Sequence, residues 1–303
     1  MPSLQSNLRI STNRAMECAE LLYKLSRGKG IFNHTIMPED ILPEGMTKGS
    51  LEHLIFITLT VALDYQRDSD TLWENSRATY NDPETQYLFS FSSVLTQTQD
   101  KIMQDMKKHH LSQRYTNDAD AWIKLSNSFS QYWNGNPLDF IEDCHWNGKT
   151  ILERLKLDKH QGSRDFPYLS GDKIGPLWVR MIRDNVGIEK INNLNKIPIP
   201  VDIHIARATF TLGVIHGTFN GPLSDLFPEI REAWRKGVMG LNSIDREMIA
   251  LDVDEPLWML SKYGCTDRDK VSGECEHFSE CELKEYCIKG KIDITSNNIQ
   301  LVT

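Results

Sequence analysis

The sequence IPIPVDIHIARATFTLGV places an aspartate, Asp202, between a proline-rich apolar lead and a second apolar stretch. Pro198 and Pro200 hold the lead extended, because proline fixes its own φ and restricts the residue before it. Apolar residues from Ile205 to Leu212 recur at helical spacing, so Asp202 falls at a helix N-terminus. A carboxylate there accepts backbone N–H bonds that keep it ionised and fixed in direction. The group is predicted to cap the helix, and it also suits the stabilisation of a cationic transition state.

Four of the six cysteines lie within 23 residues near the end of the chain. Their spacings are nine, five and five residues, from Cys265 through Cys275 and Cys281 to Cys287. Structural zinc sites contain close C-x2–4-C pairs, and this segment has none. Widely spaced thiolates suit a [4Fe–4S] cluster, in which every iron needs a ligand. The sequence therefore predicts a [4Fe–4S] cluster, with zinc as the alternative.

A third segment, FPYLSGDKIGPLWVRMI, contains Gly171, Lys173 and Gly175 between two apolar stretches. Glycine permits a tight turn and the close approach of another backbone. Amide groups at the start of the following helix can hold a phosphate. The segment predicts a helix end, a glycine hairpin and a second helix.

The elements that must position these residues are predicted to be helices. The segment GSLEHLIFITLTVALDYQ begins with Ser50 as an N-cap and is apolar on nearly every face, which indicates a central, buried helix. Core positions on another helix are predicted at Trp122, Leu125, Phe129 and Trp133. Convincing alternating strands are scarce, so the predicted fold class is all-α.

Composition limits the class of partner. The chain has 303 residues, 40% of them hydrophobic, and a formal net charge of −8. A nucleic-acid ligand would need a local positive surface, because an acidic average repels phosphate. No secretory signal or membrane span is visible, so we expect a cytoplasmic protein that has no membrane partner.

Taken together, the hairpin, the sequence VDIH at 201–204 and the cysteine loop resemble the helix-hairpin-helix DNA glycosylase superfamily. In that family a glycine-rich hairpin grips the DNA backbone, and a VDTH-like segment carries the catalytic aspartate. The cysteine loop after PLWMLSKYGC is similar to that of the endonuclease III-like members. The resemblance implies that Asp202 is catalytic and that the four cysteines bind the cluster.

The resemblance covers roughly residues 50–290 and has three departures from the endonuclease III pattern. The first two cysteine spacings are longer than is usual in the family, and residues 75–160 match no family motif. The segment from hairpin to aspartate is also longer. In that respect it is more similar to the archaeal 8-oxoguanine glycosylases, which have an IPVD-like approach.

The implied fold has two lobes. Residues 1–49 are expected to pack with a C-terminal lobe, 215–303, that includes the cysteine loop 265–287. Residues 50–214 are expected to form a helical domain with the hairpin and Asp202. The implied activity is a monomeric DNA glycosylase that flips a modified base out of double-stranded DNA and cleaves its N-glycosidic bond.

Further site residues are implied by position. Lys173 matches the lysine of the archaeal enzymes, which would attack the sugar and give AP lyase activity through a Schiff base. For Lys173, the alternative is a phosphate contact or a solvated side chain.

Gln66 is placed to fill the gap left by the flipped base; the alternative is an ordinary polar helix end. Lys289 and Lys291 are placed to contact DNA, as is usual for basic residues of this loop.

Some aromatic and basic residues have two interpretations. Tyr168 and Trp178 would stack on a base or pack in the core. The sequence KKHH at 107–110, with Arg114, is a basic patch for phosphates or a solvated surface.

Two other functions remain open. The first alternative is a non-catalytic protein that binds DNA and senses damage. The second is an N-glycosyl hydrolase that acts on a free nucleoside or nucleotide. The identity of an excised base cannot be inferred from the sequence, because pocket shape determines it.

Overall fold

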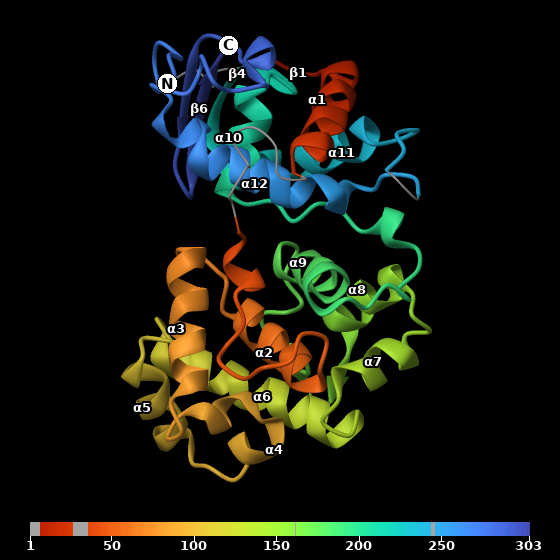
Figure 1. The fold of residues 1–303 in the computed structure, drawn as a ribbon, viewed down its shortest axis with the longest axis vertical. Helices are drawn as coiled ribbons and strands as arrows, with labels where there is room; N and C mark the ends of the chain where they lie inside the picture. Colours follow the sequence, from red (N-terminus) through yellow and green to blue (C-terminus); the bar gives the residue numbers. More distant parts are fainter. Residues whose placement is uncertain (1–6, 27–35, 161, 244–245) are drawn as a thin grey trace. The chain divides into compact units, whose positions relative to one another are not determined.

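The computed structural model describes residues 7–26, 36–160, 162–243 and 246–303. The chain divides into two compact units, here called unit 1 (Met1–Thr35 with Pro198–Thr303) and unit 2 (Ile36–Ile197). The described ranges contain twelve α-helices and two antiparallel sheets (Figure 1). The fold is therefore mostly helical, but the expectation of an all-α fold is wrong because unit 1 contains a four-stranded sheet.

Unit 2 is built from helices α2 to α9 and a short hairpin. Their bounds are α2 Leu51–Ala62, α3 Ser69–Asn81, α4 Phe91–Val94, α5 Gln99–Lys108, α6 Tyr115–Tyr132, α7 Pro137–Asp143, α8 Gly148–Leu157, α9 Ile174–Met181, β2 Lys159–His160 and β3 Ser163–Arg164. Short 3₁₀ helices occur at η2 Pro38–Asp40, η3 Gln86–Phe89 and η5 Leu194–Lys196, and a π-helical turn, η4 Ile182–Val186, follows α9.

The central helix predicted from the sequence is confirmed as α2. The Ser50 hydroxyl accepts a hydrogen bond from the His53 amide at 3.1 Å, as an N-cap should. Phe56 is fully buried and lies against the rings of Trp73, Tyr80 and Phe89 at centroid distances of 5.0–5.9 Å. A helix that is apolar on every face is stable only when neighbours cover it. In Figure 1 the helix indeed lies among the others of unit 2.

The predicted core of α6 is also confirmed. Trp122, Leu125 and Phe129 are fully buried, and Trp133 just after the helix is 5% exposed.

The indole N–H of Trp178, in α9, donates to the Thr58 hydroxyl at 3.0 Å, and its ring is fully buried. Trp178 is therefore a core residue and is not placed to stack on a base.

His53 gives unit 2 a sensitivity to acid. Its Nδ1 accepts a hydrogen bond from the Gly49 amide at 3.1 Å, and the residue is 1% exposed. Burial, helped by the nearby Lys48 charge, lowers the pKa of His53 to about 4 from an ordinary 6.5. Between these values the unfolded chain binds a proton that the folded chain does not, so stability falls as pH falls. We expect a loss of about 3 kcal/mol between pH 6.5 and 4.

Denaturant unfolding at several pH values measures this loss. A His53→Asn variant supplies the control, because its amide oxygen can still accept from Gly49 but does not titrate. The wild-type protein should lose more stability than the variant over this range. Parallel pH profiles for the two proteins would show that His53 does not contribute.

Unit 1 combines both ends of the chain. Its helices are α1 Thr12–Leu25, α10 Ile203–Thr211, α11 Phe227–Gly237 and α12 Asp254–Tyr263. Its strands are β1 Asn7–Ile10, β4 Ile215–Pro222, β5 Lys291–Ile294 and β6 Asn298–Val302, with short 3₁₀ helices at η6 Leu223–Leu226, η7 Ala250–Val253, η8 Cys265–Asp267 and η9 Lys284–Tyr286.

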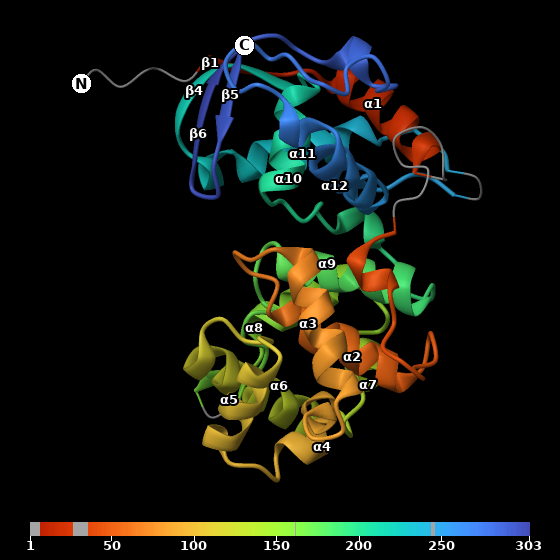
Figure 2. The same cartoon turned by 60° about the vertical axis from the view of Figure 1, so that its left-hand side comes forward.

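The sheet of unit 1 has the order β1-β4-β6-β5, and all neighbours are antiparallel. Residues far apart in sequence pair across it, such as Asn7 with Thr218 and Phe219 with Leu301. Beside the sheet, α1 packs on α11 and α10 packs on α12 (Figure 2). A Cβ at Gly237 would lie 2.6 Å from the Cβ of Ala15, so glycine allows the close approach of α11 to α1.

The boundary between the units falls at Pro198, ahead of Asp202. The helix that carries Asp202, α10, packs on α12 and therefore belongs to unit 1. The sequence-based division instead groups this helix with residues 50–214.

Within the described ranges, none of the helices has the length and apolar character needed to cross a lipid bilayer.

Candidate functional site

Asp202 lies where the sequence predicts it, at the N-cap of α10. One carboxylate oxygen, Oδ1, accepts hydrogen bonds from the His204 amide at 2.9 Å and the Ile205 amide at 3.0 Å. The side chain is half-buried, while the preceding Val201 is 1% exposed and anchors the extended lead in the core. Two amide donors therefore fix the direction of this carboxylate at the positive end of the helix dipole.

A cationic side chain lies on the same helix. Arg207 donates to the Ser261 hydroxyl at 3.0 Å and to the Thr266 hydroxyl at 3.3 Å. Burial lowers the pKa of Arg207, and negative charge on Cys265 and Asp202 counteracts this. Arg207 therefore interacts electrostatically with the aspartate and with the first cysteine of the loop.

His204 reinforces the contact between α10 and α12. Its Nδ1 lies 3.3 Å from the Ser261 hydroxyl, and its ring lies 5.3 Å from the ring of Trp258. The same serine accepts from Arg207, so one residue of α12 holds two side chains of α10. The first turn of the helix, which includes Asp202, is thereby fixed on a rigid neighbour.

The four loop cysteines are free thiols, and they begin at Cys265 directly after α12. Burial raises the pKa of Cys265 well above its usual range, and negative charge on Cys287, Cys281 and Cys275 raises it further. Burial and the charge of Cys281 and Cys275 raise the pKa of Cys287 to about 11. The fold therefore gathers four thiols that interact with one another.

In the described part of the chain, no group of three or more His, Cys, Asp or Glu residues is arranged to hold a metal ion. A single ion requires its ligands to converge on one point. A cubane cluster instead places each thiolate on a different iron, so its ligands stand further apart.

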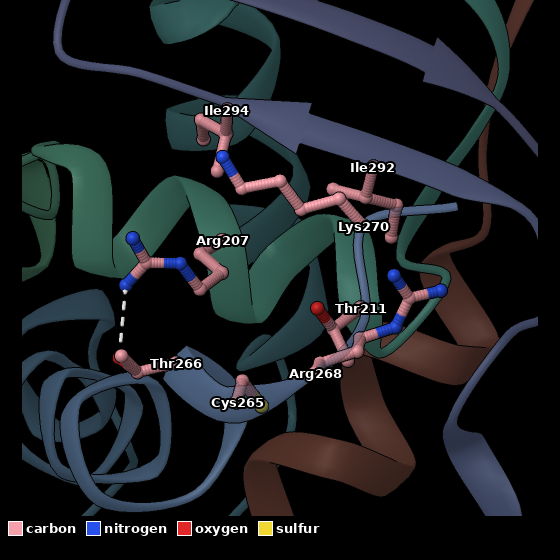
Figure 3. A pocket seen from close by; sticks show the side chains of 8 residues that line it. All are labelled: Arg207, Thr211, Cys265, Thr266, Arg268, Lys270, Ile292 and Ile294. Carbon is pink, nitrogen blue, oxygen red and sulfur yellow. Dashed lines mark hydrogen bonds between the residues drawn. The ribbon is translucent and has the colours of Figure 1, made fainter. Parts of the chain in front are cut away.

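Cationic side chains surround the first cysteine. Arg207, Arg268, Lys270 and Cys265 line a small open cavity of about 50 Å³, together with Thr211, Thr266, Ile292 and Ile294 (Figure 3). The cavity lies between α10, the start of the cysteine loop and β5. Positive charge at this place favours thiol ionisation, and the charge of Arg207 opposes the rise in the pKa of Cys265.

Arg268 also fixes the loop. Its guanidinium donates to the carbonyls of Ile288 and Gly290, both at 3.0 Å, and to that of Asp269 at 3.2 Å. The residue is 8% exposed, and burial lowers the pKa of its side chain. The beginning and the end of the cysteine loop are therefore joined by one buried cation.

The two lysines expected to meet DNA lie at the end of this loop. Lys289 is exposed, and its ammonium lies 5.7 Å from the centre of the Phe278 ring. Lys291 is half-buried at the start of β5. Both are within a few residues of Cys287, and their contact with DNA stays a prediction.

The predicted glycine hairpin, in the segment before α9, is built differently from the prediction. Neither Gly171 nor Gly175 has a positive φ; the left-handed residue is Tyr168, with φ 68°. Gly175 lies in the first turn of α9, where a Cβ would be 3.0 Å from the Leu169 carbonyl oxygen. The glycine thus serves close backbone packing, which is the second of its two predicted roles.

Lys173 is the N-cap residue of α9 and contacts a buried aspartate. Its Nζ lies 3.2 Å from Oδ2 of Asp64 and 3.3 Å from the Asp64 carbonyl oxygen. The Asp64 side chain is 7% exposed, and that of Lys173 is 23% exposed. The lysine is therefore held in position within unit 2, next to the segment that carries Gln66.

Gln66 is exposed after the end of α2, as the sequence predicts, and has a φ of 54°. A positive φ is uncommon for a residue other than glycine and costs about 1 kcal/mol or more. Such strain often marks a functional segment, and it is compatible with the predicted DNA contact of Gln66.

Arg207, Arg268 and Asp64 are not predicted from the sequence. Arg207 follows Asp202 by five residues on one helix, and this spacing could have been used to predict that the two charges lie near each other. Arg268 and Asp64 gain their roles only through contacts with distant segments, and no local pattern marks them.

A comparison of the sequence with models of known protein families finds no matching family. A comparison with curated proteins finds no match either. Function is therefore inferred from the residues, their geometry and the motif resemblance.

Proposed function

We propose that this protein is a DNA glycosylase that extrudes a modified base and cleaves its N-glycosidic bond. The observation that carries the proposal is Asp202: a half-buried carboxylate, held by two backbone amides at the N-terminus of α10, next to a loop of four free thiols. The VDIH sequence around it resembles the catalytic segment of the helix-hairpin-helix glycosylases.

Cleavage of the N-glycosidic bond develops positive charge on the sugar as the base departs. A carboxylate that is already fixed and ionised stabilises this charge without reorganising during the reaction. It also orients the nucleophile, or removes a proton from it when that nucleophile is water. These are the roles proposed for Asp202.

We also propose that the cysteine loop binds a [4Fe–4S] cluster through Cys265, Cys275, Cys281 and Cys287. Four free thiols from one loop are the donor set that such a cluster requires, and Arg207 and Arg268 supply compensating positive charge. The cluster would order the loop that carries Lys289 and Lys291. A single zinc ion is the alternative occupant.

A screen of the purified protein against short duplexes, each with one modified base, tests the proposed activity. We expect free base to be released from at least one duplex. Release from free nucleosides but from no duplex would favour the alternative of a nucleoside hydrolase. Binding without release from any duplex would favour a non-catalytic DNA-binding protein.

Borohydride treatment of the active mixture tests Lys173 as a nucleophile. A lysine that attacks the sugar forms a Schiff base, which borohydride reduces to a stable protein–DNA adduct. We expect the adduct from the parent protein and none from Lys173→Gln. An adduct of equal yield with the variant would exclude Lys173, while base release without any adduct would indicate water as the nucleophile.

A further inference from the structure

Three segments of unit 2 meet around Arg114. The guanidinium carbon of Arg114 lies 5.1 Å from the ring centre of Tyr65 and 5.0 Å from that of Tyr168. Both distances are within the range of a cation–π interaction. Tyr65 follows α2, Arg114 precedes α6 and Tyr168 lies in the hairpin before α9. The three side chains are here called the Arg114 clamp.

A buried carboxylate holds the inner end of the Arg114 clamp in place. Asp118 is 2% exposed and accepts hydrogen bonds from the Arg114 amide at 2.9 Å and the Ser112 hydroxyl at 2.8 Å. Its Oδ1 lies 3.7 Å from Nε of Arg114 and accepts the Tyr168 hydroxyl at 3.4 Å. The arginine is therefore held on its Nε side and between two rings.

The outer part of the clamp is open to solvent. The Arg114 side chain is 39% exposed and Tyr65 is 47% exposed. Within the ranges that the structure describes, the terminal guanidinium nitrogens of Arg114 donate no hydrogen bond to the protein. Ordering an exposed arginine between two rings costs about 2 kcal/mol of rotamer entropy. A rigid guanidinium with open donors suits the recognition of paired acceptor atoms.

Three residues with a left-handed backbone lie around the same place. Tyr168, Gln66 and His110 have φ values of 68°, 54° and 55°. Gln66 follows Tyr65 directly, and the His110 carbonyl accepts from Arg67 at 3.5 Å. Strained residues persist where the surrounding contacts over-determine them, and they cluster at ligand-binding sites.

The clamp lies close to the hairpin lysine. Lys173 contacts both the carbonyl and the carboxylate of Asp64, and Asp64 immediately precedes Tyr65. Tyr168 and Lys173 are five residues apart in the hairpin. A nucleotide brought to Lys173 would therefore be near the exposed guanidinium.

We propose that the Arg114 clamp determines specificity by binding a pair of acceptor atoms on the target nucleotide. This inference rests on the proposed glycosylase function. The acceptors belong either to the edge of the base, as with O6 and N7 of a guanine-type base, or to its flanking phosphate. Arginine recognises both through the same two-pronged donor geometry.

Two duplexes distinguish the two sources of acceptors. One contains the modified base that the protein releases, and the other contains a tetrahydrofuran abasic analogue at the same position. Binding is measured over a range of salt concentrations for the parent, Arg114→Met and Arg114→Lys. Lys124→Met is the matched control, because Lys124 is an exposed cation within α6 that lies outside the clamp.

If the clamp reads the base, Arg114→Met and Arg114→Lys should both weaken binding of the base-containing duplex roughly 10-fold or more, and should leave the abasic duplex unaffected. If it reads the phosphate, Arg114→Met should weaken both duplexes and reduce the salt slope by about one, while Arg114→Lys retains most affinity. Either result supports the inference, provided that Lys124→Met behaves like the parent.

Parent-like binding and base release by both Arg114 variants would overturn the role of the clamp and leave the proposed glycosylase function standing. A parent protein that neither releases a base nor binds duplex DNA would overturn the proposed function, and the inference with it. Thermal unfolding of each variant identifies loss of fold, and Tyr65→Phe, which keeps the ring, should retain parent-like binding.

Discussion

Replacement of Asp202 by asparagine is expected to reduce base release by about 100- to 1000-fold or more, while the fold and DNA binding are retained. Asparagine is as good an N-cap as aspartate, so the hydrogen bonds from the His204 and Ile205 amides can be kept. What the substitution removes is the negative charge that is proposed to stabilise the cationic sugar. Single-turnover base release and duplex binding, measured on the same samples, separate the two effects.

Two further variants complete this test. Asp225→Asn changes an exposed aspartate of the same unit and should behave like the parent protein. Asp202→Ala removes both charge and cap, so it should also lower stability by about 1 kcal/mol. If Asp202→Asn releases base as fast as the parent, Asp202 is not catalytic and acts only as a helix cap.

Purified protein is expected to be brown, with an absorption band at about 400 nm and about four irons per chain. Cys281→Ala should lose the band and most of the iron, because it removes a ligand from one corner of the cluster. If the proposed cluster orders the loop, the variant should also bind DNA more weakly and be cut more readily by protease within residues 265–290.

Cys144→Ala is the control for this variant. Cys144 is a fully buried, free thiol of unit 2 and lies outside the cysteine loop. Its replacement should keep the iron and the absorption band. One zinc ion per chain in place of iron would contradict the cluster, and metal-free protein with parent-like base release would remove any catalytic need for it.

The helices that carry the candidate site were accessible to sequence reasoning. The apolar run after Ser50 predicts α2, and the spacing of Trp122, Leu125 and Phe129 predicts the buried face of α6. The predicted cap at Asp202 is confirmed by its two amide contacts. These features depend on residues within one or two helical turns, where the chain itself fixes the spacing.

The sheet of unit 1 was not accessible in this way. Its strands are short, and β1 pairs with β4 across about 200 residues of intervening chain. A strand such as β4, with Gly217 and Gly221 inside it, has little alternation to mark it. Only tertiary pairing makes it a strand, and only packing on α12 places α10 in unit 1.

By itself, the sequence determined the candidate residues for the proposed chemistry: a capped aspartate, a hairpin lysine and four spaced cysteines. The tertiary structure decided what surrounds them, namely Arg207 and Arg268 beside the thiols, Asp64 on Lys173 and the two tyrosines on Arg114. The physical reason is range. Helix caps and helical faces arise from neighbours along the chain, whereas ion pairs and ring contacts depend on residues that only folding brings together.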